Sequence, residues 1–403
     1  MDTFARIRDV YSAAARKAPG LRRRLSAAGL RAEDILGPDA LNSIPVLKKE
    51  QLLALQAAEP PFGGFLASDV AEIGHIYVSP GPIIEPSPVD DGSGHGMQTM
   101  FKEAGIGPGD IALNTWSYHL VPAGLLFDKA LRACGATVIP AGTGNTELLA
   151  DLVISLRPTA FLGSAANFAT LVDQLRRSGR QIPEDWSLRH AFLAGELGDW
   201  SSRRDALERD FALKTWTCYG TADFGLIGYE VAGREGYRVH PDRYVQICDP
   251  ETGAPLPVGE AGEVVVTTLV PGWPLIRFGT GDLGRAATLA ADGGVEWLAS
   301  VEGRVAAARK IREIFVYPDH LRQLSAKLEA VNEARLHVGR RGSREIITLE
   351  VLIAPGCQVD DEVIGNCFRS LTRLRADQVA RVGTPQEFTH SNSISEGQSV
   401  LAS

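Results

Sequence analysis

The feature that most constrains this chain is an alternation of short apolar runs with amphipathic segments between residues 110 and 220. The apolar runs, rich in β-branched and aromatic residues, are GDIALNTW, ATVIPA, TAFLGS, HAFLAGE and KTWTCYG. The segments between them have helical spacing, with Asn145 or Thr146 as a cap of one helix and Gly135 at the end of another. This alternation predicts an α/β fold with a mostly parallel sheet.

The pattern changes on both sides of this region. Residues 1–60 are predicted to form helices. After Tyr219, strands alternate with Gly/Pro turns, which indicates a small antiparallel β unit. The last hundred residues run helix, strand, strand, helix, a pattern typical of a small α+β lobe. We therefore predict a large N-terminal α/β domain, residues 1–302, and a small mobile C-terminal domain, residues 303–403.

Composition excludes several classes of protein. The 403 residues include 41 Lys and Arg and 49 Asp and Glu, a net charge of −8 that disfavours a nucleic-acid partner. No apolar run approaches the ~18 residues that span a bilayer, so no membrane segment is expected. The cysteines are scattered and odd in number, which fits a reducing compartment and predicts a cytoplasmic location. The five cysteines form no CxxC pair, which indicates neither a disulfide framework nor a zinc cluster. His240 is interpreted as an ordinary surface histidine.

Two of the predicted strands end on residues suited to a ligand. One ends on Gly195 and Glu196, and the other on Tyr219, Gly220, Thr221 and Asp223. Ligands of parallel sheets gather beyond the carboxyl ends of the strands. Glycine allows close approach, tyrosine can stack on a flat ring, threonine can hold a phosphate oxygen and aspartate can bind Mg²⁺. The alternative is a pair of strand-ending turns without a role.

A third stretch, PLIRFGTGDLGR, follows the valine-rich predicted strand GEVVVTTLV. Thr-Gly-Asp is favourable turn chemistry, which predicts a tight hairpin turn at residues 280–282. The same turn would hold the Asp282 carboxylate as an acceptor for a diol such as ribose. The residues alone leave both interpretations open.

Read in order, AGE, YGTAD, PLIRFGTGD and GRVAAARKIREIFVYP resemble the motifs of the adenylate-forming enzymes. Within these the chain is most similar to the phenylacetate-CoA ligase family. The segments IPVLKKEQL, GIGPGD and GATVIPAGTGNTE fit the same family, so the resemblance covers nearly the whole chain.

The resemblance implies a two-step reaction. A carboxylate attacks the α-phosphate of ATP to give an acyl-adenylate and pyrophosphate, and the thiol of CoA then displaces AMP. The implied substrates are a small aromatic or acyl carboxylic acid, ATP and CoA, with Mg²⁺ as the metal and AMP as the released nucleotide. The family's large domain carries the nucleotide site, and its small domain moves between the two steps.

The resemblance also assigns roles to residues. Asp282 would bind the ribose with Arg304 beside it, and Arg277 is a structural partner or a phosphate contact. The adenine site would comprise Tyr219, Gly220, Gly195 and Glu196. The implied catalytic residues are Thr221 at the α-phosphate, Asp223 as the Mg²⁺ ligand and Lys310 in the thioester step. The acid would lie against Trp116, Tyr118 and His119.

Several positions depart from the family. The Ser/Thr/Gly-rich phosphate loop is replaced by YVSPGPIIEP, whose prolines have no N–H to donate and whose Glu85 is negative. Gln398 stands where the family has a lysine, and loss of such a charged donor costs roughly 100- to 1000-fold in rate. Ala306 and Ala307 replace the hinge carboxylates, and Glu313 replaces a glycine.

Three functions therefore remain open. The chain is an active aryl- or acyl-CoA ligase, an enzyme of the partial reaction that uses a preformed acyl-adenylate, or a non-catalytic nucleotide- or acyl-binding protein. The oligomeric state is open as well, with a homodimer as one option.

Overall fold

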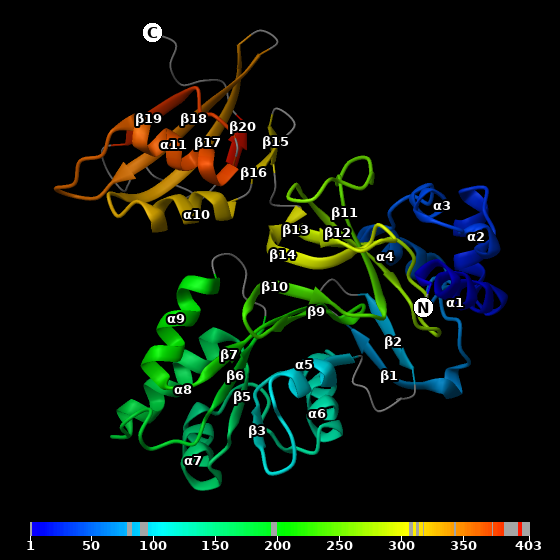
Figure 1. Cartoon of the computed structure of the whole chain (residues 1–403), viewed down its shortest axis with the longest axis horizontal. Coiled ribbons are helices and arrows are strands. Elements are labelled where there is room, and N and C mark those ends of the chain that lie inside the picture. Colours follow the sequence, from blue (N-terminus) through cyan, green and yellow to red (C-terminus); the bar gives the residue numbers. More distant parts are fainter. Residues whose placement is uncertain are drawn as a thin grey trace. The chain divides into compact units, whose positions relative to one another are not determined.

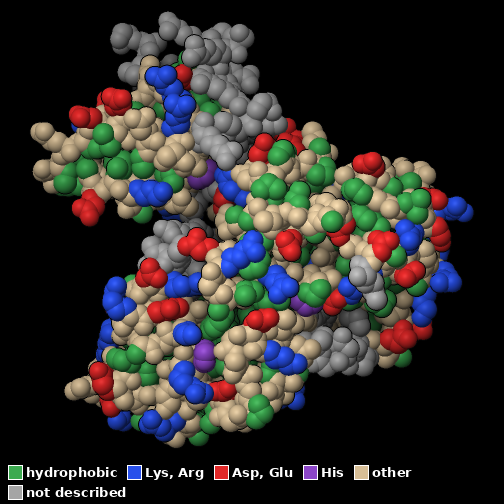
Figure 2. Space-filling model, viewed as in Figure 1, with side chains coloured by type: hydrophobic (Ala, Val, Ile, Leu, Met, Phe, Trp, Pro, Cys, Tyr) green, Lys and Arg blue, Asp and Glu red, His purple; other side chains and the backbone are tan. Residues whose placement is uncertain are grey.

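The computed structural model describes residues 2–78, 83–88, 96–194, 200–305, 309–311, 314–316, 318–341, 344–372, 374–382 and 394–396. The chain divides into two compact units, residues 1–301 and residues 302–403 (Figure 1). No helix among the described residues is long and apolar enough to cross a membrane. Acidic and basic side chains are interspersed over the visible face (Figure 2).

The first unit contains a five-stranded parallel sheet with the order β4-β3-β5-β6-β7. Its strands are β3 (Ile111–Asn114), β4 (Thr137–Pro140), β5 (Ala160–Gly163), β6 (His190–Leu193) and β7 (Lys214–Trp216). Its helices are α5 (Met97–Glu103), α6 (Ala123–Ala133), α7 (Thr146–Leu156), α8 (Ala165–Arg177) and α9 (Trp200–Phe211). The predicted α/β fold class is confirmed.

Helices on both faces bury this sheet. Ala160 and Leu162 of β5 face a core shared with α5 and α6, whereas Phe161 between them faces a second core shared with α7 and α8. Burial on both faces explains why the strands read as continuous apolar runs rather than as alternating patterns. The predicted cap at Asn145 is present, since its side chain accepts a hydrogen bond from the backbone N–H of Leu148 at 3.4 Å.

The prediction of one strand over KTWTCYG is wrong. β7 ends at Trp216, and β8 (Cys218–Thr221) joins a seven-stranded sheet with the order β11-β12-β13-β14-β10-β9-β8. The backbone N–H of Thr217 donates instead to the buried carboxylate of Glu230 at 2.8 Å, so the chain passes from one sheet to the other at this residue. The remaining strands of this sheet are β9 (Gly225–Val231), β10 (Arg234–Val239), β11 (Arg243–Cys248), β12 (Ala261–Thr268), β13 (Phe278–Leu289) and β14 (Val295–Arg304).

Helices at the N-terminus pack on the seven-stranded sheet. They are α1 (Thr3–Lys17), α2 (Pro19–Ala27), α3 (Pro38–Asn42) and α4 (Lys49–Ala58), with short 3₁₀ turns at Ala32–Asp34 and Val70–Glu72. Ile7, Tyr11 and Leu21 are fully buried in one core with residues of β11, β12 and β13. The antiparallel pair β1 (Ile73–Val78) and β2 (Ile84–Pro88) follows.

The second unit is an α+β structure around a four-stranded sheet with the order β19-β18-β17-β20. Its elements are β15 (Arg309–Ile311), β16 (Ile314–Val316), α10 (Pro318–Lys327), β17 (Val331–Arg341), β18 (Arg344–Ile353), α11 (Asp361–Thr372), β19 (Gln378–Val382) and β20 (Ile394–Glu396). Alternate residues of β18, Ile347, Leu349 and Val351, are fully buried in its core. Strands alternate their side chains across the sheet, and the sequence EIITLEVLIA follows that period.

Arg277, at the start of β13, attaches the N-terminal segment to the sheet. Its side chain is among the largest that are fully buried, and its guanidinium donates to the carbonyls of Asn42 at 2.6 Å and Ile44 at 2.7 Å, and to that of Gly253. The backbone of Leu47 donates to the Arg277 carbonyl at 2.8 Å. These contacts favour the structural one of the two roles considered for Arg277.

We expect Arg277→Met to lower the free energy of unfolding by about 3–5 kcal/mol, because buried carbonyls lose their donor. Urea unfolding followed by tryptophan fluorescence measures the change. The exposed Arg209 of α9 provides a control, and Arg209→Met should change stability by less than about 0.5 kcal/mol. Similar small effects of both substitutions would contradict the anchoring role.

Candidate functional site

Two motifs that lie far apart in the sequence meet at a buried hydrogen bond. The Tyr219 hydroxyl of β8 is 3.0 Å from Asp282 Oδ2 and 3.1 Å from Thr280 Oγ1, both on β13. All three side chains are buried. The structure thus brings together the tyrosine predicted to stack on adenine and the aspartate predicted to bind ribose, and these two roles stay predictions.

Asp282 is placed by a bulge inside a strand. Val265 of β12 lies opposite Gly279, whereas Glu263 lies opposite Leu283, so β13 contains extra residues at this point. Gly281 has a φ of +74°, a left-handed conformation that glycine adopts at little cost. The predicted hairpin turn at residues 280–282 is therefore wrong. A bulge changes the direction of a side chain within a continuous strand, and it does so here for Asp282.

Glu263 and Lys48 support this bulge. The Glu263 carboxylate, with 2% of its side chain exposed, accepts from the backbone N–H of Gly281 at 3.2 Å and forms an ion pair with Lys48. The Glu263 carboxylate packs directly against the backbone of Gly279, because a Cβ on Gly279 would lie 2.3 Å from Glu263 Oε1. The buried charge is thus paired and hydrogen-bonded, as buried charges must be.

The β8–β9 hairpin explains the glycine of the YGTAD motif. A Cβ on Gly220 would lie 2.5 Å from the carbonyl oxygen of Gly225, so the hairpin itself requires a glycine here. Thr221 ends β8, and its hydroxyl oxygen is buried without a hydrogen-bond partner in the part of the chain that the structure describes. A buried hydroxyl without a partner is uncommon and is compatible with a ligand contact.

Asp223 follows in the turn and is paired with a lysine. Only 1% of its side chain is exposed, and its Oδ2 lies 3.0 Å from the Nζ of Lys49 at the start of α4. Its Oδ1 is buried and has no hydrogen-bond partner among the described residues. The residue predicted to bind Mg²⁺ therefore already faces a cation of the protein.

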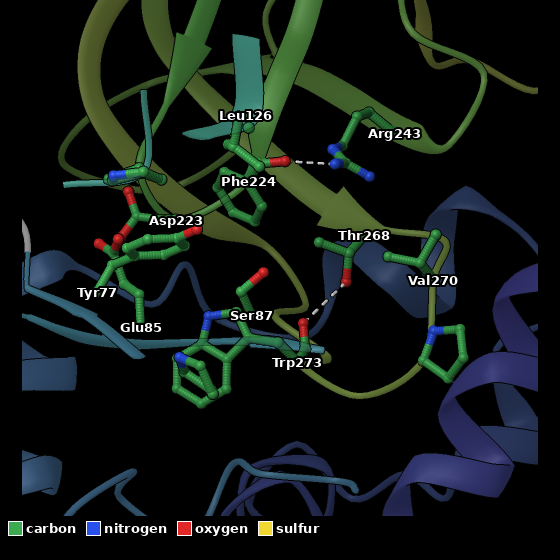
Figure 3. Close-up of a pocket in the computed structure, with 15 residues that line it drawn as sticks. Tyr77, Glu85, Ser87, Leu126, Asp223, Phe224, Arg243, Thr268, Val270 and Trp273 are labelled. Carbon is green, nitrogen blue, oxygen red and sulfur yellow. Dashed lines mark hydrogen bonds between the residues drawn. The ribbon is translucent and has the colours of Figure 1, made fainter. Parts of the chain in front are cut away.

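A small cavity of about 50 Å³ borders Asp223. Figure 3 shows Tyr77, Glu85 and Asp223 toward one side of its lining and Arg243 and Trp273 toward others. Burial lowers the pKa of Arg243 to about 10, so this residue carries a positive charge at neutral pH. A cavity of this size accommodates water molecules but is smaller than the roughly 150 Å³ that holds a benzene ring.

Glu85 belongs to the segment that replaces the family's phosphate loop. It lies in β2 opposite Tyr77 of β1, and 3% of it is exposed. Residues 79–82 of this segment lie outside the described residues. The Glu85 carboxyl group is thus buried in the wall of the cavity beside Asp223.

The three residues predicted to contact the acid lie between β3 and α6. Trp116 stacks on Phe127 with ring centroids 5.9 Å apart, and His119 is exposed. The Tyr118 hydroxyl accepts a hydrogen bond from Asn114 Nδ2 at 2.8 Å and donates one to Asp128 at 3.3 Å. The pKa of Tyr118 is raised, mainly by burial and secondly by the negative charge of Asp128. The cavity beside Asp223 is lined from the start of α6 by residues 122 and 126 rather than by these three.

Other predicted residues are only partly described. Gly195 and Glu196 lie outside the described residues, as do Ala306, Ala307, Glu313 and Gln398. Lys310 lies in β15, where its backbone is opposite Phe315 of β16, and its side chain is not described. Arg304 ends β14, is exposed and belongs to the second unit.

The interpretation of His240 as a surface histidine is wrong. Only 4% of it is exposed, its Nδ1 accepts from the backbone N–H of Asp242 at 3.2 Å, and a Cβ on Gly96 would lie 2.1 Å from its Nε2. Burial lowers its pKa to about 4, so it is neutral at physiological pH. Within the described ranges, no group of three or more His, Cys, Asp or Glu residues could hold a metal ion.

Curated relatives identify the family. A phenylacetate-coenzyme A ligase of Thermus thermophilus is 30% identical over 358 residues, which cover 84% of this chain and 78% of that protein. The chain belongs to the phenylacetate-CoA ligase family. The Escherichia coli phenylacetate-coenzyme A ligase is 27% identical over 352 residues, 83% of this chain and 77% of that protein. No protein-family model matches the chain.

Solved structures of adenylate-forming ligases share the fold. A 2-hydroxyisobutyryl-CoA ligase, crystallised in an open conformation with 2-HIB-AMP and CoA, has a TM-score of 0.83 and 22% identity over 97% of this chain and 90% of its own. The amide bond synthetase McbA of Marinactinospora thermotolerans has a TM-score of 0.54 and 18% identity over 79% of this chain and 67% of its own.

The sequence interpretation missed Lys48, Lys49 and Glu263. The two lysines appeared only as part of the segment IPVLKKEQL, and Glu263 only as the first charged residue of a valine-rich strand. A carboxylate inside a buried strand needs a partner. That requirement is the signal that could have directed attention to Glu263, but not to its particular lysine.

We predict that Asp282→Ala weakens AMP binding by about 100-fold, because charge-assisted hydrogen bonds to the ribose are lost. Isothermal calorimetry measures the affinity, and circular dichroism verifies that the variant is folded. The exposed Glu260 lies in the same unit, and Glu260→Ala should bind AMP as the wild type does. Unchanged AMP affinity of the Asp282 variant would refute the ribose role.

Proposed function

We propose that this protein is an ATP-dependent aryl- or acyl-CoA ligase that works through an acyl-adenylate. The observation that carries the proposal is the buried contact of Tyr219 with Asp282. This contact brings the YGTAD and FGTGD motifs next to each other, in a chain that belongs to the phenylacetate-CoA ligase family, and so supports the proposal.

In this proposal some residues of the site bind the nucleotide and others take part in the reaction. Asp282 accepts hydrogen bonds from the ribose hydroxyls, and Tyr219, held by its hydroxyl, presents its ring to the adenine. The Thr221 hydroxyl, buried without a partner among the described residues, donates to an α-phosphate oxygen. The resemblance assigns Arg304 to the ribose and Lys310 to the thioester step, in which CoA is the acceptor of the acyl group.

The substrate acid is a small aromatic or acyl carboxylic acid. The relatives named phenylacetate-coenzyme A ligase and the 2-hydroxyisobutyryl-CoA ligase of similar fold support this range of acids. Trp116, which stacks on Phe127, provides an aromatic surface next to the start of α6.

ATP–pyrophosphate exchange with a panel of aryl and short acyl acids tests the proposal. Exchange that depends on one acid, followed by CoA-thioester formation, is the expected result. AMP or acyl-adenylate binding without exchange would instead favour an enzyme of the partial reaction. Absence of both binding and exchange would refute the proposal.

The second candidate is a homologue that binds acyl-adenylate without making it. The specific observation in its favour is Glu85, a carboxylate in the segment that corresponds to the phosphate loop, buried in the same cavity wall as Asp223. A negative charge at this position opposes the approach of a polyphosphate, and Gln398 removes the positive charge that the family places at the α-phosphate.

We expect Gln398→Lys to raise the exchange rate about 100-fold, because a charged donor again stabilises the transition state. Transfer to CoA from a supplied acyl-adenylate should change much less. A variant that combines Gln398→Lys with a Ser/Thr/Gly-rich loop at residues 79–86 separates the effect of Gln398 from that of the altered phosphate loop. If it also lacks exchange while AMP binds, the protein is a binding protein.

We also propose that residues 303–403 move as a separate lobe between the two steps. Limited proteolysis should cut first near residues 300–306 and release a stable large fragment. Primary cleavage elsewhere, with this junction intact, would contradict the proposal.

A further inference from the structure

The position for which the family implies Mg²⁺ is Asp223, and its surroundings do not fit a metal that the protein binds. Mg²⁺ prefers an octahedral shell that includes several water molecules. The Asp223 side chain is 1% exposed, and its Oδ2 faces the Lys49 ammonium at 3.0 Å. No metal-binding group of three or more acidic, His or Cys residues is present in the described ranges.

Lys49 is held in this place by the fold. It begins α4, and Leu47, two residues earlier, donates its backbone N–H to the carbonyl of Arg277 just before β13 and accepts at its own carbonyl from the backbone N–H of Gly279 in β13. The neighbouring Lys48 forms its own ion pair, with Glu263. The two adjacent lysines therefore face two different buried carboxylates, Lys48 pairing with Glu263 and Lys49 with Asp223.

Charge makes the ammonium and a divalent ion mutually exclusive here. A dication bound about 2.1 Å from Asp223 Oδ2 would lie no more than about 5 Å from the Lys49 ammonium, which is 3.0 Å from the same oxygen, and low polarity strengthens the repulsion. The same cavity wall contains Arg243, a second buried cation, and Glu85, a second carboxylate.

We propose that Lys49 is a built-in cation that occupies the metal position at Asp223, so that the protein itself holds no divalent ion there. The inference rests on the proposed function only for the statement that this is a nucleotide site. The pairing and its consequence for metal binding can be tested without nucleotide.

The experiment is a titration of the full chain with Mn²⁺ in the absence of nucleotide, in which electron paramagnetic resonance measures the bound Mn²⁺. The wild type should bind no Mn²⁺ that depends on Asp223. Lys49→Met leaves the Asp223 carboxylate without that cation and should bind one Mn²⁺ at least about tenfold more tightly than the wild type. Lys48→Met is the matched control and should resemble the wild type, and Lys49→Met/Asp223→Asn should lose the gained site.

Two results would overturn the inference. One is Mn²⁺ bound to the wild type and lost in Asp223→Asn, and the other is a folded Lys49→Met variant that gains no Mn²⁺. If Lys49→Met fails to fold, the comparison of the wild type with Asp223→Asn still decides. Because no ATP is present, an absence of ligase activity does not affect the outcome.

Discussion

The candidate site depends on the hydrogen bonds that the buried Arg277 guanidinium donates to main-chain carbonyls. The guanidinium is paired with main-chain carbonyls of Asn42, Ile44 and Gly253, and thus fixes a loop of the N-terminal segment against β13. Arginine suits this task because its planar group offers several donors and stays charged. The left-handed backbone of Arg277, with a φ of +45°, is maintained by the same set of contacts.

From this anchor the N-terminal segment reaches both halves of the site. Lys48 pairs with Glu263, which receives the Gly281 N–H and stabilises the bulge that presents Asp282. Lys49 pairs with Asp223 beyond β8. The N-terminal segment, for which the sequence predicted only helices, therefore contributes the cations that compensate two buried carboxylates. Without these cations, burial of the carboxylates would be costly.

The sequence predicted the parallel sheet well because burial on both faces produces apolar runs that are easy to recognise. The motifs YGTAD and FGTGD, selected from the sequence, do meet in the structure through the hydrogen bond of Tyr219 with Asp282, and their roles toward a nucleotide stay predictions. Their local geometry was not predictable. A turn and a bulge both favour Thr-Gly-Asp, and only the register of β12 against β13 distinguishes them. Likewise, the break at Thr217 depends on Glu230, a partner from another strand.

The partner of a buried charge also could not be predicted from the sequence, because it lies far away along the chain. From the sequence, Asp223 is a free carboxylate near a phosphate, and a metal is the natural partner for it. In the structure the partner is Lys49, which lies 174 positions earlier in the chain. A lysine is a fixed single charge on a flexible stem, whereas a metal ion is exchangeable and binds several oxygen atoms at once. A site that contains the lysine is ready without metal, but it cannot gather phosphate oxygens around one centre. Under the proposed function, positioning of the nucleotide then depends more on Tyr219, Thr221 and Asp282, and the bulge that orients Asp282 is supported by the hydrogen bond from the Gly281 N–H to the buried Glu263 carboxylate.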